Sequence, residues 1–255
     1  MFQFLVASCI VTLTVPYLSV DPNPGIRVPS LRRQESSATP RAICRGSSTK
    51  RLLALTFDAC PSSVNGGYDE AIVRILLQTR APATFFLAGR WAARHRRATR
   101  FLARQKLFAI GSHGHAHAHL SHLGASAIGA DLRRSKEVLQ RIIGRPITLF
   151  RPPYAEDDPR TSHIADSLGL VTILFDFPSG DPDTAATARK LVDYVSTRAR
   201  NGSIITMHVN GRGWHTAEAL PEILSRLRKR GFTFVTVPTL LDVNSPRSPE
   251  APGGQ

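Results

Sequence analysis

The sequence has little cysteine, little lysine and no recognisable nucleic-acid-binding motif. Of its three cysteines, Cys9 falls in an apolar N-terminal segment. Cys44 and Cys60 could pair in an oxidising compartment, but a cysteine in a linker and a cysteine beside a candidate site are not obvious partners. No catalytic base adjoins Cys60 in the sequence, which favours a small buried thiol over a nucleophile.

Acidic residues are also scarce. The chain has 19 Asp and Glu against 33 Lys and Arg, and its formal net charge is +14. A basic surface favours an anionic neighbour such as a cell-wall polymer, lipid headgroups or nucleic acid. The basic residues are scattered, however, and the densest patch, Arg90 to Lys106, is typical of a solvated helix face. We therefore expect a monomer with no nucleic-acid partner, and association with a membrane or the cell wall stays open.

The chain divides into four predicted regions. Residues 1–20 are apolar and uncharged and resemble a signal peptide or membrane anchor, although the usual positive start is missing and the run is short for a membrane span. Residues 21–50 are rich in Pro, Ser and Arg and predict a disordered linker. Residues 51–243 form the folded domain, and 244–255 a disordered tail. These regions predict a secreted or periplasmic protein, with a membrane anchor as an alternative.

Within residues 51–243, strand and helix patterns alternate about every 30 residues without an internal sequence repeat. The apolar run from Leu52 to Phe57, for example, predicts a buried strand. Such alternation implies a parallel sheet with helical crossovers. About seven units imply an α/β fold of the barrel type, a distorted (β/α) barrel of about seven parallel strands.

Polar side chains follow five of the predicted strands. They are Asp58, His113 with His117, Arg151, Asp176 and His208. In a barrel the carboxyl ends of parallel strands meet at one mouth, where such enzymes place their chemistry. One polar residue after a strand is ordinary, but five strands ending in titratable or cationic residues indicate an active site.

The histidines are concentrated in one place, since five of the nine lie between His113 and His122. Neutral imidazole is a good ligand for zinc and similar ions. His113 and His117 are four residues apart, and in a helical turn that spacing puts both rings on one face. The alternatives are an alternating strand or a chance polar loop.

Five short motifs occur in a fixed order. They are Thr56-Phe57-Asp58, His113-Gly114-His115-Ala116-His117, Arg151-Pro152-Pro153-Tyr154, Phe175-Asp176 and Met207-His208. This ordered set resembles the polysaccharide deacetylases, carbohydrate esterase family 4 with the NodB homology domain. The resemblance spans about residues 51–243, nearly all of the predicted folded part.

The resemblance implies a role for each matched residue. Asp58 would be the general base that activates the attacking water, and Arg151 would orient the carboxylate of Asp58. His113 and His117 would hold a divalent metal, typically Zn²⁺. The backbone N–H of Tyr154 would help to stabilise the oxyanion.

The resemblance also supplies the acid of the reaction. His208 would protonate the leaving amine, and Asp176 would hold His208 and raise its pKa. The implied activity is hydrolysis of carbon–nitrogen amide bonds other than peptide bonds, with an acetylated polysaccharide as the substrate.

The sequence departs from the family pattern at the first motif. Ala59 stands where the family has its third metal ligand, an aspartate, and Cys60 stands where it has a glycine. Three alternatives could supply the missing metal ligand. The first, which we favour, is water together with a shift of Asp58 onto the metal. The others are ligation by Cys60, or a ligand from His115, His119 or Asp69. The fourth motif departs as well, because Pro178 stands where a second acid is common, with Asp181 as the nearest replacement. A sub-branch of the family whose first motif reads Asp-Ala-Cys is similar, which argues for a variant site over decay.

These features predict a metal-dependent hydrolase that removes N-acetyl groups from a glycan, either peptidoglycan or a polymer of N-acetylglucosamine. The main alternative is a catalytically inactive, glycan-binding relative, which Ala59 supports. A binding module has no use for an acid and a base, which argues against that alternative, since the chain retains Asp58, Arg151, Asp176 and His208. A barrel hydrolase for small cyclic amides is a third hypothesis, which the signal-like N-terminus and the basic surface disfavour.

Overall fold

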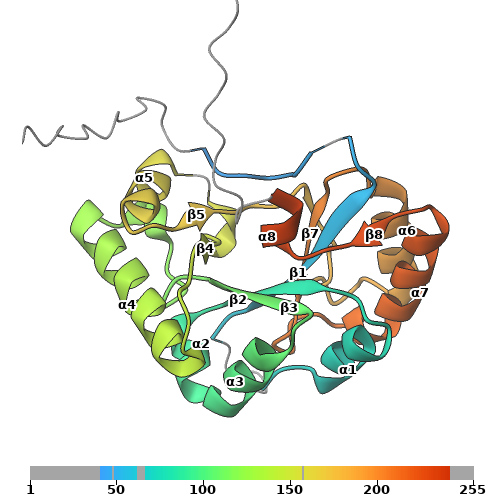
Figure 1. Cartoon of the computed structure of the whole chain (residues 1–255), viewed down its shortest axis with the longest axis horizontal. Coiled ribbons are helices and arrows are strands. Elements are labelled where there is room, and N and C mark those ends of the chain that lie inside the picture. Colours follow the sequence, from blue (N-terminus) through green and yellow to red (C-terminus); the bar gives the residue numbers. More distant parts are fainter. Residues whose placement is uncertain (1–40, 48, 62–66, 157, 242–255) are drawn as a thin grey trace, which may run out of the picture. The chain divides into compact units, whose positions relative to one another are not determined.

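The computed structural model describes residues 41–47, 49–61, 67–156 and 158–241 (Figure 1). The predicted signal or anchor segment 1–20, with Cys9, lies outside the described residues, as do residues 21–40 of the predicted linker and the predicted tail 244–255. Across the described ranges, no helix has the length and apolar character that crossing a membrane requires.

Eight strands within the described residues form one sheet whose pairings are all parallel. They are β1 (Leu52–Ala59), β2 (Ala83–Leu87), β3 (Phe108–Ser112), β4 (Leu149–Phe150), β5 (Val171–Thr172), β6 (Phe177–Pro178), β7 (Ile204–His208) and β8 (Thr233–Phe234). Seven of them follow the order β5-β4-β3-β2-β1-β7-β6 in a curled half-barrel, and β8 pairs with β1. The prediction of a distorted barrel of about seven parallel strands is confirmed.

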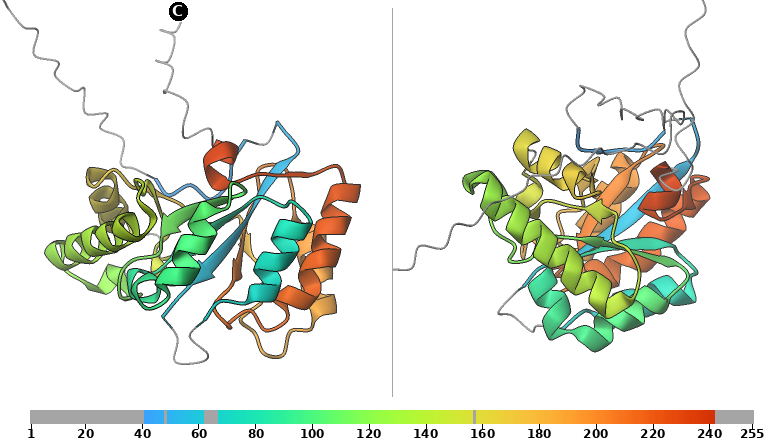
Figure 2. Two further views of the ribbon diagram at one scale, coloured as in Figure 1. Left: turned by 60° about the horizontal axis from the view of Figure 1, so that its bottom comes forward. Right: turned by 60° about the vertical axis from the view of Figure 1, so that its left-hand side comes forward.

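Helices α1 to α7 surround the strands on the outside, and the short helix α8 packs against the inner face of the sheet (Figures 1 and 2). They are α1 (Glu70–Gln78), α2 (Gly89–Arg94), α3 (Arg96–Arg104), α4 (Ala125–Ile143), α5 (Pro159–Ser167), α6 (Ala188–Arg198), α7 (Thr216–Lys229) and α8 (Val237–Leu241). Their ends follow local chemistry. Asp69 caps α1 by accepting hydrogen bonds from the N–H groups of Ala71 and Ile72, and α4 ends at Gly144, whose φ of +74° suits glycine.

Strand β1 shows how the sheet separates two cores. Its residues are almost all buried, as expected for a strand covered on both faces. Leu53, Leu55 and Phe57 belong to the large apolar cluster between the sheet and the helices, whereas Ala54 belongs to a second cluster inside the curled sheet. Because side chains alternate along a strand, Asp58 points inward, like Ala54.

The inner cluster is closed at the amino ends of the strands by two segments far apart in the sequence. Helix α8 contributes Val237 and Leu240, and Ile43 packs against the same cluster. Ile43 also pairs with Ile173, and Arg45 pairs with Ser203 next to β7. Residues 41–47, assigned from the sequence to a disordered linker, are therefore part of the fold, because their backbone pairs with the sheet.

Candidate active site

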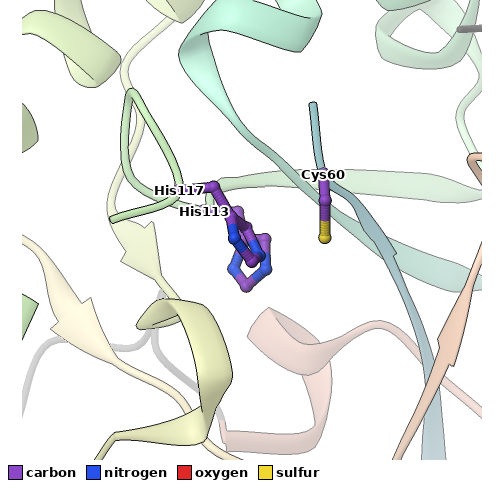
Figure 3. A group of neighbouring side chains, drawn as sticks. All are labelled: Cys60, His113 and His117. Atoms are coloured by element: carbon purple, nitrogen blue, oxygen red, sulfur yellow. The ribbon is translucent and has the colours of Figure 1, made fainter. Parts of the chain in front are cut away.

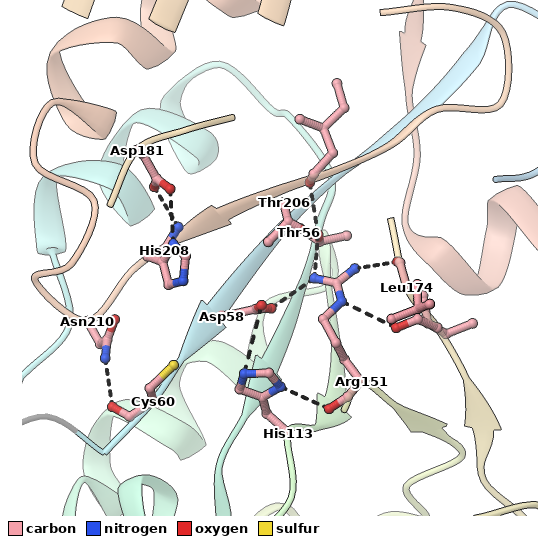
Figure 4. A network of polar contacts seen from close by, with 12 residues as sticks. Thr56, Asp58, Cys60, His113, Arg151, Leu174, Asp181, Thr206, His208 and Asn210 are labelled. Carbon is pink, nitrogen blue, oxygen red and sulfur yellow. Dashed lines mark hydrogen bonds and ion pairs between the residues drawn. The ribbon is translucent and has the colours of Figure 1, made fainter. Parts of the chain in front are cut away.

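The carboxyl ends of β1 and β7 bring two ionisable side chains together. Asp58 and His208 are direct register partners on these parallel strands, so their side chains lie on the same face of the sheet. Both line a cavity of about 210 Å³ that also contains His113, His117 and Arg151 (Figure 4). The sequence predicted that six residues meet at one mouth, and five of them line this cavity. The sixth, Asp176, does not.

Arg151, next to the end of β4, holds Asp58. Its Nη1 donates to Asp58 Oδ1 at 2.8 Å and to Thr56 Oγ1 at 2.8 Å, and its Nη2 donates to the carbonyl of Leu174 at 3.0 Å. The Arg151 side chain is fully buried, with its guanidinium over the ring of Phe86. Burial raises the pKa of Asp58, but the nearby Arg151, His113 and His208 lower that pKa more, so Asp58 is a carboxylate at neutral pH.

Asp181 holds His208. Its Oδ1 is 3.0 Å from His208 Nδ1, and its Oδ2 accepts from the backbone N–H of His208 at 2.7 Å and from Thr216 Oγ1 at 2.7 Å. A carboxylate only accepts hydrogen bonds, so Nδ1 carries a proton and Nε2 is the ring nitrogen left for chemistry. Burial lowers the pKa of His208, but Asp181 and Asp58 raise it more, and the net shift is upward.

The prediction that Asp176 orients His208 is wrong. Both carboxylate oxygens of Asp176 bind Arg200, and Oδ2 also accepts from Ser203 Oγ at 2.8 Å. Ser203 precedes β7 and His208 ends it, so Asp176 lies at the other end of that strand. The physical reason is β6, a short strand alongside β7 that begins immediately after Asp176 and carries the chain toward the mouth, where Asp181 takes the predicted place.

A cluster of metal-ligand type lies beside Asp58. One donor atom from each of Cys60, His113 and His117 lies within 4.8 Å of the others (Figure 3). His113 Nδ1 is 2.9 Å from the carbonyl of Arg151, which only accepts, so Nδ1 is the protonated nitrogen and Nε2 keeps its lone pair. Burial and His113 lower the pKa of His117 to about 3, so its ring is neutral at neutral pH.

This donor set can hold a divalent ion. Zinc takes imidazole nitrogen at about 2.0–2.1 Å and cysteine sulfur at about 2.3 Å, usually with four ligands, and three protein donors leave one position open. Because the donors already lie within 4.8 Å of one another, small side-chain rotations bring them to one ion. Burial and Asp58 raise the pKa of the Cys60 thiol to about 12, so Cys60 is a neutral thiol in the chain alone.

Of the other ligands that the sequence left open, Asp69, His119 and His115 lie away from this cluster, whereas Asp58 lies beside it. Asp69 caps α1, and His119 Nδ1 binds Glu156 Oε1 at 2.5 Å. His115 lines a different cavity, beside Trp91. Asp58 Oδ2 is 3.9 Å from His113 Nε2, with its other oxygen held by Arg151.

The histidine segment is a loop, and the helical turn expected from the spacing is wrong. Asp131 closes this loop by accepting from the N–H groups of His115 and Ala116 at 2.6 and 3.0 Å. His117 itself has a positive φ of +58°, a backbone conformation that residues other than glycine rarely adopt. Tertiary contacts therefore bring His113 and His117 together, with ring centroids 4.9 Å apart.

Tyr154 lies at the rim of the cavity. Its φ is +58° and its side chain is 53% exposed, with the ring stacked on His119 at 3.7 Å between centroids. A strained backbone of this kind at a site is held in place by its surroundings. The role of its N–H toward an oxyanion stays a prediction.

Two residues of the site were not assigned a role from the sequence. Asn210 Nδ2 donates to the carbonyl of Cys60 at 2.6 Å, and Arg212 lines the cavity. Asn210 and Arg212 follow β7 closely, so the rule that residues after a strand line the mouth could have found both.

Known proteins resemble this chain in sequence and in fold. Residues 45–173 match the family model described as polysaccharide deacetylase. A peptidoglycan-N-acetylglucosamine deacetylase from Bacillus cereus is 29% identical over 216 residues, which are 83% of this chain and 98% of that protein. A bifunctional xylanase/deacetylase from Pseudobutyrivibrio xylanivorans is 26% identical over 88% of this chain, and the match covers 37% of that protein.

Solved structures show the same fold. A CE4 family pseudoenzyme from Bacillus anthracis superimposes with a TM-score of 0.73 at 24% identity, covering 80% of this chain and 70% of that one. A peptidoglycan N-acetylglucosamine deacetylase gives the same TM-score at 25% identity, covering 79% and 92%. With half of the sequence matched by the family model, the chain belongs to the polysaccharide deacetylase family.

Proposed function

We propose that this protein is a metal-dependent hydrolase that removes N-acetyl groups from a glycan, with peptidoglycan or a polymer of N-acetylglucosamine as the substrate. The observation that carries the proposal is the register pair of Asp58 and His208 in one cavity, each with its own charged partner. The first is a carboxylate held by Arg151, and the second is an imidazole held by Asp181.

The two groups divide the proton transfers of amide hydrolysis. Asp58, ionised at neutral pH, takes a proton from water as the water oxygen attacks the acetyl carbonyl carbon. His208, whose pKa is raised, donates its Nε2 proton to the nitrogen as the carbon–nitrogen bond breaks. The products are acetate and a free amine on the sugar.

Charge developing on the acetyl oxygen needs stabilisation by a positive or donating group. A divalent ion, which we propose to be Zn²⁺, bound by His113 and His117 would polarise the acetyl carbonyl and make the attacking water more acidic. The N–H of Tyr154 would donate to the same oxygen. Arg151 fixes the carboxylate of Asp58 so that its second oxygen remains available to water.

Relatives support the class of substrate. Matching proteins are described as peptidoglycan-N-acetylglucosamine deacetylase, chitin deacetylase and bifunctional xylanase/xylan deacetylase. The first two act on N-acetyl groups of amino sugars by name, and the formal charge of +14 suits an anionic cell-wall polymer. We further propose that the protein works outside the cytoplasm, secreted or periplasmic, because residues 2–17 resemble the core of a secretion signal.

An inactive, glycan-binding relative is the second candidate, and Ala59 is the observation that favours it. Ala59 is fully buried in the cluster between sheet and helices, so position 59 supplies no ligand. Against this candidate stands the complete set of Asp58, Arg151, Asp181 and His208, whose four charges would be costly to keep in one site without a use.

The deciding experiment is acetate release from N-acetylated chito-oligosaccharides, peptidoglycan and acetylated xylan, with metal-stripped protein and again after addition of zinc. We expect zinc-dependent release from the first two substrates. His208→Ala should lower kcat by about 100- to 10,000-fold because the acid is lost. Arg189→Ala, on the exposed face of α6, is the matched control and should leave kcat unchanged.

Release of acetate from acetylated xylan alone would show that the protein hydrolyses acetyl esters and would contradict the proposed amide substrate. No release from any substrate by protein that carries zinc would reject the enzyme and favour the glycan-binding relative.

A further inference from the structure

Cys60 lies where the alternation of β1 directs it toward the cavity. Asp58 lines the cavity, Ala59 packs in the outer apolar cluster, and Cys60 lines the cavity again. This is the period of two that a strand imposes. The residue that replaces the family's glycine, and not the one that replaces its aspartate, therefore faces the two histidines.

The backbone around Cys60 is fixed by successive hydrogen bonds. The carbonyl of Asp58 accepts from the N–H of Val209 at 3.1 Å, and the carbonyl of Ala59 accepts from the N–H of Ala88 at 3.1 Å. The carbonyl of Cys60 accepts from Asn210 Nδ2 at 2.6 Å (Figure 4). Three anchors in three residues hold the Cys60 Cα in place, so only the side-chain torsion decides where the sulfur lies.

The two imidazoles are held just as firmly. His113 is buried, and its tautomer is set by the carbonyl of Arg151. His117 packs edge-on against His113 and against Tyr154, with ring centroids 4.9 and 4.6 Å apart. A ligand set that is positioned before the ion arrives loses little conformational freedom on binding.

We propose that Cys60, as a thiolate, is the third protein ligand of the metal, with His113 and His117. This inference rests on the proposed function and gives its metal site a composition of two nitrogens and one sulfur. The thiol proton leaves to solvent as the sulfur–metal bond forms. Asp58 then stays with Arg151 as a free base, which replaces our expectation that Asp58 shifts onto the metal.

Sulfur also sets which metal the site takes. Thiolate ligands select zinc and other soft or borderline ions, whereas carboxylate and water suit magnesium, calcium and manganese. A carboxylate site would accept the harder ions more readily than this site. We therefore expect a strong preference for zinc and cobalt over manganese and magnesium.

Cobalt(II) tests the ligand directly, because thiolate bound to cobalt gives a charge-transfer absorption in the near ultraviolet that nitrogen and oxygen ligands lack. Metal-stripped protein is titrated with cobalt, and absorbance and cobalt content are measured. We expect one cobalt per chain with the charge-transfer band. Cys44→Ala, the matched thiol control, should keep the band.

The variants separate sulfur from structure. Cys60→Ala should lose the band and at least about tenfold in cobalt affinity, since changes even to the partners of a ligand cost 10- to 100-fold. Cys60→Asp should bind cobalt without the band and gain affinity for manganese relative to zinc. If Cys60→Ala fails to fold, the cadmium-113 chemical shift of the unmodified protein reports a sulfur ligand without any substitution.

The outcomes distinguish the inference from the proposed function. A band that persists in Cys60→Ala, or cobalt bound by unmodified protein without a band, overturns the sulfur ligand, even if acetate is released. No binding of cobalt at all also overturns it. A band that depends on Cys60 supports the inference even if no glycan is deacetylated, in which case only the proposed activity falls.

Discussion

At the scale of single residues, Asp181 is the carboxylate that contributes most to the raised pKa of His208, with a further contribution from Asp58. Asp181 binds the ring and the backbone of His208, and its charge keeps the imidazolium stable. His208 can act as an acid only while it is protonated, so activity falls as pH rises through the pKa of His208. Lowering that pKa moves the loss of activity to lower pH.

We therefore expect Asp181→Asn to move the alkaline limb of the kcat/KM profile, which reports the free enzyme, to lower pH and to reduce kcat/KM at pH 8. An NMR titration of His208 should show its pKa falling by the same amount. Asp176→Asn is the matched control, because Asp176 lies at the far end of β7 and binds Arg200. Equal shifts in both variants would contradict the assignment of Asp181.

The buried pair of Arg151 and Asp58 makes a prediction about stability. Arg151→Ala leaves the Asp58 carboxylate buried without its partner, and breaking such a pair costs about 3–5 kcal/mol. Because Arg151 lowers the folded pKa of Asp58, the stability it contributes is present above the pKa of the unfolded chain and is lost as pH falls. The gap in unfolding free energy between variant and unmodified protein should shrink in acid.

Chemical denaturation at pH 7 and at pH 3, which is below the unfolded aspartate pKa of about 3.9, measures that gap. Arg226→Ala, which breaks exposed ion pairs with Asp193 and Glu222, is the control and should leave the free energy of unfolding nearly unchanged at both pH values. The double variant Arg151→Ala with Asp58→Asn should recover part of the loss, since no unpaired charge remains. A loss independent of pH and of residue 58 would mean that packing against Phe86, and not charge, sets the role of Arg151.

At the scale of elements, the turn between β7 and α7 positions the acid. A Cβ on Gly213 would lie 2.3 Å from Thr216 Oγ1, 2.6 Å from Asp181 Oδ2 and 2.8 Å from the carbonyl of His208. No side chain fits there without moving one of these groups, so glycine at 213 keeps Asp181 close to His208.

Gly213→Ala should therefore lower kcat by about 100-fold, the typical effect of a misplacement of about 1 Å. Steady-state kinetics and thermal unfolding measure the two effects together. Gly124→Ala is the matched control, since a Cβ there meets nothing within 4 Å. Full activity in Gly213→Ala would show that the Asp181–His208 contact tolerates the displacement.

How far the elements could be predicted depended on their length. Long periodic segments such as α4, and apolar runs such as β2, are specified locally and match the structure. The two-residue strand β6 is not, because it contains Pro178 and has no periodicity to detect. Missing β6 is what put Asp176 in the place of Asp181. The basic stretch from Arg90 to Lys106, expected to be one solvated helix face, spans two helices, α2 and α3, separated at His95.

The site was predictable in its residue types but not in all its contacts. Asp58 and His208 follow from the rule that strand ends meet, which needs only the order of elements. The loop that joins His113 to His117 depends on Asp131, which is distant in the sequence, and on a positive φ that propensity does not favour. The sequence does not decide whether Cys60 is a metal ligand, because the direction of its side chain depends on where β1 ends.

At the scale of the whole folded unit, chemistry and closure lie at opposite ends of the sheet. The mouth holds the charged groups, whereas the amino ends are closed by α8 and residues 41–47. The two closing segments touch, because a Cβ on Gly46 would lie 2.7 Å from Leu240 Cγ. Their stability should therefore be coupled to each other and independent of the mouth.

Gly46→Ala overpacks this contact and should cost about 1–3 kcal/mol, and Leu240→Ala should cost about 2–4 kcal/mol by leaving a cavity. In the double variant the new methyl group fills space that Leu240 vacates, so the loss should be smaller than the sum by about 0.5–3 kcal/mol. Denaturation of the four proteins gives this coupling energy, and acetate release per folded molecule should stay constant in all four. Additive losses would mean that the segments close the sheet separately, and a drop in activity would mean that the mouth depends on the closure.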